Sequence, residues 1–219
     1  MSLAQLDQRQ VRRVKAALAL LCLVPLALLA WRGFNHRLGA NPIEYITRST
    51  GWWTLTFLLL TLAVTPLRRW SGWNWLLRLR RMLGLTAFFY ACLHFTTYLW
   101  LDQFFDLMSI AKDIVKRPFI TVGFSAFVLL IPLAATSTKR MVQRLGGKRW
   151  QLLHRLVYAI AVLGVVHFWW LVKKDIREPL VFAAVAALLL GVRLVFLARK
   201  ARVAPQAARP VRPSTASPL

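Results

Sequence analysis

The chain has 219 residues, 58% of them hydrophobic, and a formal net charge of +23 from 30 basic and 7 acidic side chains. The hydrophobic residues form long blocks separated by short basic stretches, which leaves no room for a soluble catalytic domain. Because the basic residues alternate in number from one connection to the next, the charge indicates membrane topology and contact with anionic lipid, and it argues against a nucleic-acid partner.

Six apolar blocks are long enough, or nearly so, to cross about 30 Å of hydrocarbon at about 1.5 Å per residue. They predict an all-α integral membrane protein with one transmembrane domain over 14–198. Its spans are expected at roughly 14–31, 50–66, 83–101, 118–136, 151–171 and 179–198.

The distribution of charge predicts that both termini are cytoplasmic. With 1–13 in the cytoplasm, the cytoplasmic segments carry about 19 basic residues, whereas six of the seven acids lie on the opposite side. This orientation fits a multi-pass protein of a bacterial inner membrane. The segment 199–219, rich in Pro, Ala, Ser and Arg, is expected to be a disordered cytoplasmic tail.

The outer connection 102–117 mixes large apolar residues with charges. This pattern is typical of a short helix lying in the membrane interface, and we interpret it as a candidate docking surface for an outer partner. The two cysteines, Cys22 and Cys92, both fall inside spans. Since no CxxC or CxxCH occurs, zinc sites and covalent c-type haem lack their ligands.

Three of the four histidines fall inside predicted spans: His94 in the third, and His154 and His167 in the fifth. Ionisable residues within a membrane are costly and usually functional. Counted from the span starts, the depths are about 16 Å for His94, 5 Å for His154 and 24 Å for His167. These heights favour, by a small margin, His94 and His167 over His94 and His154 as axial ligands of one haem iron. His36 lies in an outer loop and is interpreted as a solvated residue.

Small side chains accompany these histidines. Gly84, Ala87 and Ala91 precede His94 at helical spacing, Gly164 precedes His167 by three residues, and Tyr90 and Tyr98 lie one turn from His94. They would leave room for a flat macrocycle with the tyrosines packed against it. Small residues also let bare helices approach closely, so a transporter or assembly factor with helix-packing histidines stays an alternative. The shortage of carboxylates inside the spans argues against proton-coupled transport.

Six stretches over roughly 39–175 carry a resemblance to a known family: NPIEYITRSTGWW, LAVTPLRR, RRMLGLTAFFYACLHFTTYLWLDQ, IVKRPFITVGF, IPLAATST and KRWQLLHRLVYAIAVLGVVHFWW. In these the chain resembles the ferric-reductase-like transmembrane family, whose b-type haems are held by histidines on the third and fifth of six helices. It is most similar to the haem-binding membrane subunits of bacterial periplasmic methionine sulfoxide reductase systems. The resemblance implies one or two haem b groups, with His94, His154 and His167 at the ligand positions.

The resemblance also implies a role. In that family the membrane subunit passes electrons from the quinone pool to a periplasmic molybdenum-cofactor subunit that reduces methionine sulfoxide in oxidised proteins. FMN is an associated cofactor, a cytoplasmic flavin reductase is an alternative donor, and the membrane subunit has no catalytic substrate site of its own. Two-haem relatives carry a second histidine on the third helix, where this chain has Arg80, and a fused flavin and nicotinamide domain, which is missing here. Electrons are therefore expected to arrive from another molecule, and a membrane ferric reductase acting on an external acceptor stays the alternative within electron transfer.

Overall fold

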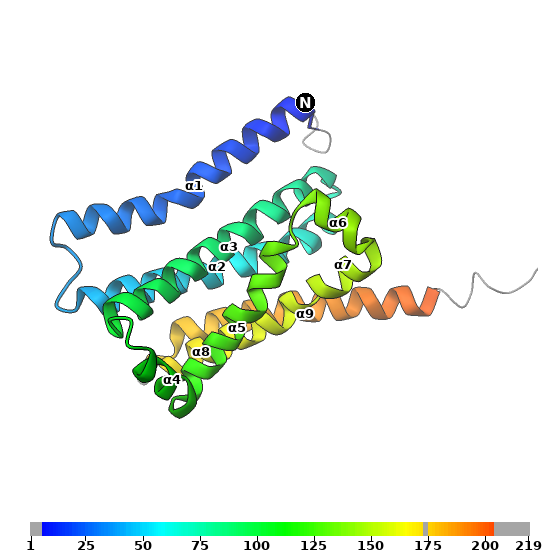
Figure 1. Ribbon diagram of the computed structural model, residues 1–219. Coiled ribbons are helices and arrows are strands. Elements are labelled where there is room, and N and C mark those ends of the chain that lie inside the picture. Colours follow the sequence, from blue (N-terminus) through cyan, green and yellow to red (C-terminus); the bar gives the residue numbers. More distant parts are fainter. Residues whose placement is uncertain (1–5, 173–174, 204–219) are drawn as a thin grey trace, which may run out of the picture.

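The computed structural model describes residues 6–172 and 175–203, and throughout these ranges its regular structure is helical, without strands (Figure 1). Its elements follow in chain order as α1 (Gln8–Phe34), α2 (Pro42–Ser71), the 3₁₀ turn η1 (Asn74–Leu76), α3 (Leu77–Thr97), the π-helical turn η2 (Tyr98–Asp102), α4 (Leu107–Lys116), α5 (Pro118–Ala135), α6 (Lys139–Leu145), α7 (Gly147–His154), α8 (Leu156–Leu171) and α9 (Arg177–Val203).

Six helical segments in the described ranges are long and apolar enough to cross a membrane, which confirms the prediction of an all-α protein with six spans. They are Gln8–Phe34, Pro42–Ser71, Asn74–Asp102, Pro118–Ala135, Gly147–Leu171 and Arg177–Arg199. Residues 199–203 continue α9, and the remainder of the segment expected to be a disordered tail lies outside the described residues.

The helices extend beyond the apolar blocks because local capping, not hydropathy, sets their ends. The Asn41 side chain accepts a hydrogen bond from the Glu44 amide at 3.1 Å, so α2 begins at Pro42, where a missing amide donor costs nothing. The same helix ends at Gly72, whose φ of 74° is the left-handed conformation that terminates many helices.

The core of the bundle consists of two closely packed helix pairs, α2 with α3 and α5 with α8, with α9 against α8 and α2. Leu62, Ala87 and Ala161 are completely buried where these helices meet. Helix α1 is set apart from the others (Figure 1) and buries few residues. One buried hydrogen bond attaches it to the bundle, from the Tyr90 hydroxyl to the Cys22 carbonyl at 2.7 Å.

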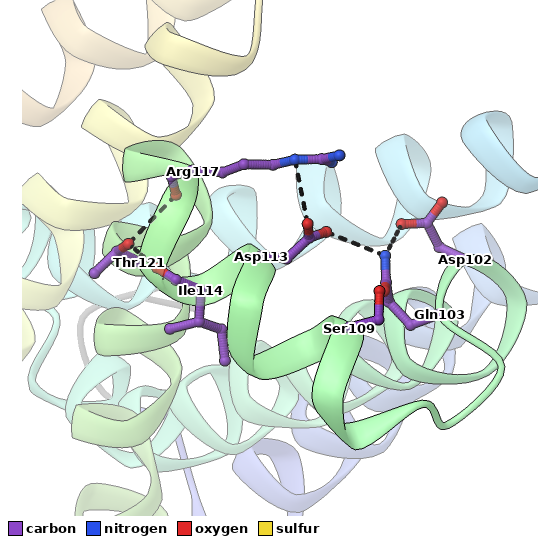
Figure 2. A network of polar contacts seen from close by, with 7 residues as sticks. All are labelled: Asp102, Gln103, Ser109, Asp113, Ile114, Arg117 and Thr121. Atoms are coloured by element: carbon purple, nitrogen blue, oxygen red, sulfur yellow. Dashed lines mark hydrogen bonds and ion pairs between the residues drawn. The ribbon is translucent and has the colours of Figure 1, made fainter.

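The connection between α3 and α5 forms a polar corner. Asp106 caps α4 by accepting hydrogen bonds from the Met108 and Ser109 amides, at 3.0 and 3.2 Å. Figure 2 shows the Gln103 amide between two carboxylates, 3.1 Å from Asp102 and 3.2 Å from Asp113. A helix is therefore found within 102–117, as the sequence predicts. Its exposed Leu107, Met108 and Val115 are the side chains expected to meet the membrane interface or a partner.

Candidate functional site

A cavity of about 630 Å³ lies among α2, α3, α5 and α8, within the range of small-molecule and cofactor sites. Its walls are mostly apolar, and both His94 and His167 line it. Its charged lining residues gather where α2 begins and where α3 and α5 meet the polar corner: Glu44, Arg48, Asp102 and Arg117. We call that end the mouth of the cavity.

His94 of α3 and His167 of α8 face each other across this cavity. Their ring centroids are 6.1 Å apart and their planes make an angle of 73°. With metal–nitrogen bonds of about 2 Å on either side and the ring centre about 1 Å further, two imidazoles that share one ion in line have centroids roughly 6 Å apart. The spacing of the two rings therefore fits axial ligation of a single iron.

Main-chain carbonyl groups hold both rings. The Nδ1 atom of His94 lies 2.9 Å from the Thr47 carbonyl oxygen, and that of His167 lies 2.7 Å from the Phe119 carbonyl oxygen. Since a carbonyl oxygen only accepts, Nδ1 must donate in each case, which fixes the tautomer and leaves Nε2 as the metal-binding nitrogen. Neither Nε2 atom forms a hydrogen bond with any described residue.

A glycine opens the way to each carbonyl group. Gly51 follows Thr47 by four residues, and Gly123 follows Phe119 by four. A Cβ atom at Gly51 would lie 3.0 Å from Cε1 of His94, and one at Gly123 would lie 2.6 Å from Nδ1 of His167. Each imidazole therefore reaches the backbone of the facing helix through a gap that any larger residue would fill.

Sequence reasoning missed these two glycines because it considered only the helices that carry the histidines. The sequence did contain a signal for them. A glycine inside an apolar helix costs about 1 kcal/mol of helix stability relative to alanine, so its presence usually indicates that another group packs closely against it. The expected small residues Ala87, Ala91 and Gly164 do line the cavity. Gly84 does not, and a Cβ atom added to it would lie 3.7 Å from the Thr61 side chain.

The two tyrosines predicted to flank the site behave differently. Tyr98 lines the cavity beside the mouth, as expected. Tyr90 lies outside the cavity lining: its ring packs against Phe57 and its hydroxyl bonds to α1. Four residues rotate a side chain about 40° beyond one full turn of helix, which is enough to direct Tyr90 toward a different neighbour from His94.

His154 does not join the other two intramembrane histidines. It ends α7, stacks on Trp150 with centroids 3.9 Å apart, and places Nδ1 3.1 Å from the Trp150 carbonyl oxygen. Its Nε2 atom is buried. The structure therefore brings together His94 and His167 and leaves His154 outside the cavity lining. His36 is exposed in the loop between α1 and α2.

Arginines stand beside both anchoring carbonyls at the mouth. Arg48 follows Thr47 directly, and Arg117 precedes Phe119 by two residues. Each is about half exposed and pairs with a carboxylate one turn earlier, Arg48 with Glu44 at 3.3 Å and Arg117 with Asp113 at 3.4 Å. Figure 2 shows the second pair as part of the polar corner.

Comparison with known proteins gives consistent matches. The family described as ferric reductase like transmembrane component matches residues 50–165. The chain is 62% identical over 193 residues to the protein-methionine-sulfoxide reductase heme-binding subunit MsrQ of Herminiimonas arsenicoxydans, covering 87% of this chain and 88% of that protein. It is 61% identical to the MsrQ subunit of Azospira oryzae, covering 85% and 81%, and 57% identical to that of Ralstonia nicotianae, covering 91% and 93%.

Proposed function

Because the chain belongs to the ferric reductase-like transmembrane family, and within it to the MsrQ subunits, we propose that it is a multi-pass membrane subunit that binds haem b between His94 and His167 and passes electrons to a methionine sulfoxide reductase. The observation that carries the proposal is the pair of facing imidazoles, 6.1 Å apart and both anchored through Nδ1. The names of the relatives support both the haem and the reductase system.

Held by His94 and His167, a haem would supply one-electron chemistry, which suits electron transfer rather than bond-making catalysis. The protein's own contribution is to orient the two imidazole rings and to enclose the cofactor in an apolar cavity. The carbonyls of Thr47 and Phe119 set the planes of the two rings, and the glycines at 51 and 123 let the rings reach them. Apolar lining residues such as Leu55 and Phe127 exclude water from the interior.

Arg48 and Arg117 are suited to hold the two carboxylate groups that haem b carries. Both line the cavity at its mouth, one on each wall. Their present ion pairs are exposed and so worth about 1 kcal/mol or less each. Exchanging Glu44 or Asp113 for a carboxylate of the haem therefore costs little, and planar guanidinium groups bind carboxylates with two parallel hydrogen bonds.

The direction of transfer rests on the charge distribution. With both termini in the cytoplasm, the mouth and α4 face the periplasm, where a molybdenum-cofactor reductase subunit would dock against the exposed Leu107 and Met108. Family resemblance supports the quinone pool as donor, FMN as a second cofactor and a cytoplasmic flavin reductase as the alternative donor. This assignment places the protein in a bacterial inner membrane.

Absorption and electron paramagnetic resonance spectra of the purified protein test the haem site. The wild type and the His36→Ala and His154→Ala variants are expected to show a low-spin ferric signal and a reduced b-type spectrum. His94→Ala and His167→Ala are expected to lose the low-spin signal, because each removes one axial ligand. Loss of that signal in His154→Ala but not in His167→Ala would contradict the pairing.

A second measurement tests the direction of transfer. Protein reconstituted with a quinol and the periplasmic reductase should oxidise the quinol when methionine sulfoxide is added. A haem that quinol does not reduce, but that a flavin reductase does, would identify the alternative donor.

A further inference from the structure

The carbonyl group of Thr47, which holds the His94 ring, has a second side-chain partner. The hydroxyl oxygen of Thr50 lies 3.0 Å from the Thr47 carbonyl oxygen and 2.9 Å from that of Ile46. A hydroxyl group has one proton to donate, and two acceptors at nearly equal distances share it. Thr50 is only 2% exposed, so this hydroxyl group is enclosed by the helices.

Thr50 itself is not the main acceptor for the imidazole. Its hydroxyl oxygen lies 3.5 Å from Nδ1 of His94, whereas the Thr47 carbonyl oxygen lies 2.9 Å from the same nitrogen. N–H···O hydrogen bonds usually measure about 2.7–3.2 Å, so the Nδ1 proton goes to the carbonyl oxygen. Thr50 therefore acts on His94 through the carbonyl group that both side chains contact.

The carbonyl group that holds the other ring has no such hydroxyl partner. In both helices a glycine follows the anchoring residue by four positions, but the residue at the third position is Thr50 after Thr47 and Val122 after Phe119. Within the part of the chain that the structure describes, His167 is the one side chain that donates to the Phe119 carbonyl. A single hydroxyl group therefore distinguishes the two anchors.

An additional donor weakens a carbonyl oxygen as an acceptor. The oxygen has two lone pairs, and in α2 the Gly51 amide already donates to the Thr47 carbonyl as part of the helix. His94 and Thr50 add two more donors, so less electron density is left for each. A hydrogen bond from Nδ1 to an acceptor makes an imidazole more basic at Nε2. Thr50 therefore makes His94 the weaker electron donor of the two rings.

We propose that Thr50 is a positioning residue that raises the reduction potential of the haem held by His94 and His167, an inference that rests on the proposed function. Thr50 does not line the cavity, so it acts only through the Thr47 carbonyl. An axial ligand that donates less electron density favours ferrous over ferric iron, and hydrogen bonding around the ligands is one means by which a protein sets the potential. The hydroxyl group thus makes the haem easier for its electron donor to reduce.

Potentiometry of the haem-loaded full chain tests the proposal. Thr50→Val keeps the shape of the side chain but removes the hydroxyl group, and the carbonyls of Ile46 and Thr47 keep their partners within the helix. At a fixed potential the ratio of ferric to ferrous haem should rise about threefold. This corresponds to a fall of about 30 mV, at about 59 mV per tenfold change. Thr50→Ser, which keeps the hydroxyl group, should restore the wild-type potential.

Two further variants separate tuning of the haem from a structural effect. Val122→Thr places a hydroxyl group three residues after Phe119, where a threonine in a helix can donate to that carbonyl, and should raise the potential. Thr54→Val is the matched control: its hydroxyl group donates to the Thr50 carbonyl at 2.8 Å, and the residue lines the cavity. Its potential should match the wild type. A retained low-spin signal shows that both ligands stay bound in each variant.

A second measurement does not depend on electron transfer. In proton NMR of the reduced full chain labelled with ¹⁵N-histidine, the Nδ1 proton of His94 should move downfield in Thr50→Val, because its hydrogen bond strengthens, while that of His167 stays in place. The proposal is overturned if the Thr50→Val potential is unchanged or higher, or if Thr54→Val lowers it equally. A wild type without low-spin haem would instead contradict the proposed function, and the shift of the Nδ1 proton would still test the hydrogen bond.

Discussion

Gly123 lies so close to His167 that a Cβ atom added to it would be 2.6 Å from Nδ1 and 2.7 Å from Cε1 of the ring. Real side chains essentially never approach to such distances, so either the ring or the backbone of α5 would have to move. The carbonyl oxygen of Phe119 accepts a hydrogen bond from the same nitrogen at 2.7 Å, so a displacement of the ring also strains this bond.

Gly123→Ala should therefore disturb the haem site. We expect a shifted low-spin electron paramagnetic resonance signal, because the plane of the His167 ring rotates, and a haem content reduced several-fold. Gly191→Ala is the matched control: it lies in α9 with nothing within 4 Å of its added Cβ atom, so its spectrum should match the wild type. Identical signals in the two variants would show that the gap at position 123 does not orient the ring.

Replacing the arginines at the mouth should weaken haem binding. Arg48→Gln and Arg117→Gln are each expected to lower haem affinity about tenfold by removing a charge-assisted hydrogen bond to a carboxylate. Both should also lower the reduction potential, because a nearby positive charge favours the ferrous state. Arg37→Gln serves as control, since Arg37 lies over the Trp31 ring in the loop between α1 and α2. Haem titrations and potentiometry are the measurements. Equal haem affinities and equal reduction potentials in all three variants would contradict the proposed role of the arginines at the mouth.

The attachment of α1 should depend on one hydroxyl group. Tyr90→Phe keeps the ring contact with Phe57 but removes the buried hydrogen bond to the Cys22 carbonyl. We expect the free energy of unfolding to fall by about 1 kcal/mol or more, because the carbonyl is left without this donor. Denaturation in detergent would measure the loss, and hydrogen exchange should locate it in α1. Unchanged exchange in α1 would mean that lipid or other contacts hold this helix.

The cap of α4 gives a prediction for the polar corner. Asp106→Ala removes the acceptor of the Met108 and Ser109 amides and should destabilise α4 by about 1 kcal/mol. Faster hydrogen exchange at these two amides is the direct measurement. Asp102→Ala is the control from the same corner, since its carboxylate accepts a hydrogen bond from Gln103 and caps no helix (Figure 2). Equal exchange in both variants would contradict the capping role.

The sequence predicts the helices, and by a small margin it favours His94 beside His167, because apolar length and residue counting along a helix are local properties. Counting placed these two histidines about 8 Å apart in height, and the structure places their ring centroids 6.1 Å apart. The supporting groups were not predictable in the same way. The carbonyls of Thr47 and Phe119 are main-chain atoms that every residue possesses, so only the fold shows which of them face a histidine.

The direction in which a side chain points could also not be predicted by counting residues along a helix. Tyr90 and Tyr98 are equally spaced from His94, yet one lines the cavity and the other contacts α1. Arg193 of α9 likewise donates hydrogen bonds to Thr65 of α2 and Tyr158 of α8, residues that are far from it in the sequence. Contacts of this kind depend on how each helix is rotated relative to its neighbours, and no short sequence motif specifies that rotation.

The anchoring of both imidazoles by peptide oxygens has a genetic consequence. A substitution at position 47 or 119 exchanges a side chain but leaves the oxygen that accepts from Nδ1 in place. Inherited variation at these two positions can therefore change the side chain without releasing the rings. Position 123 is far more constrained, because even one methyl group there would lie 2.6 Å from the ring, and at position 51 it would lie 3.0 Å away.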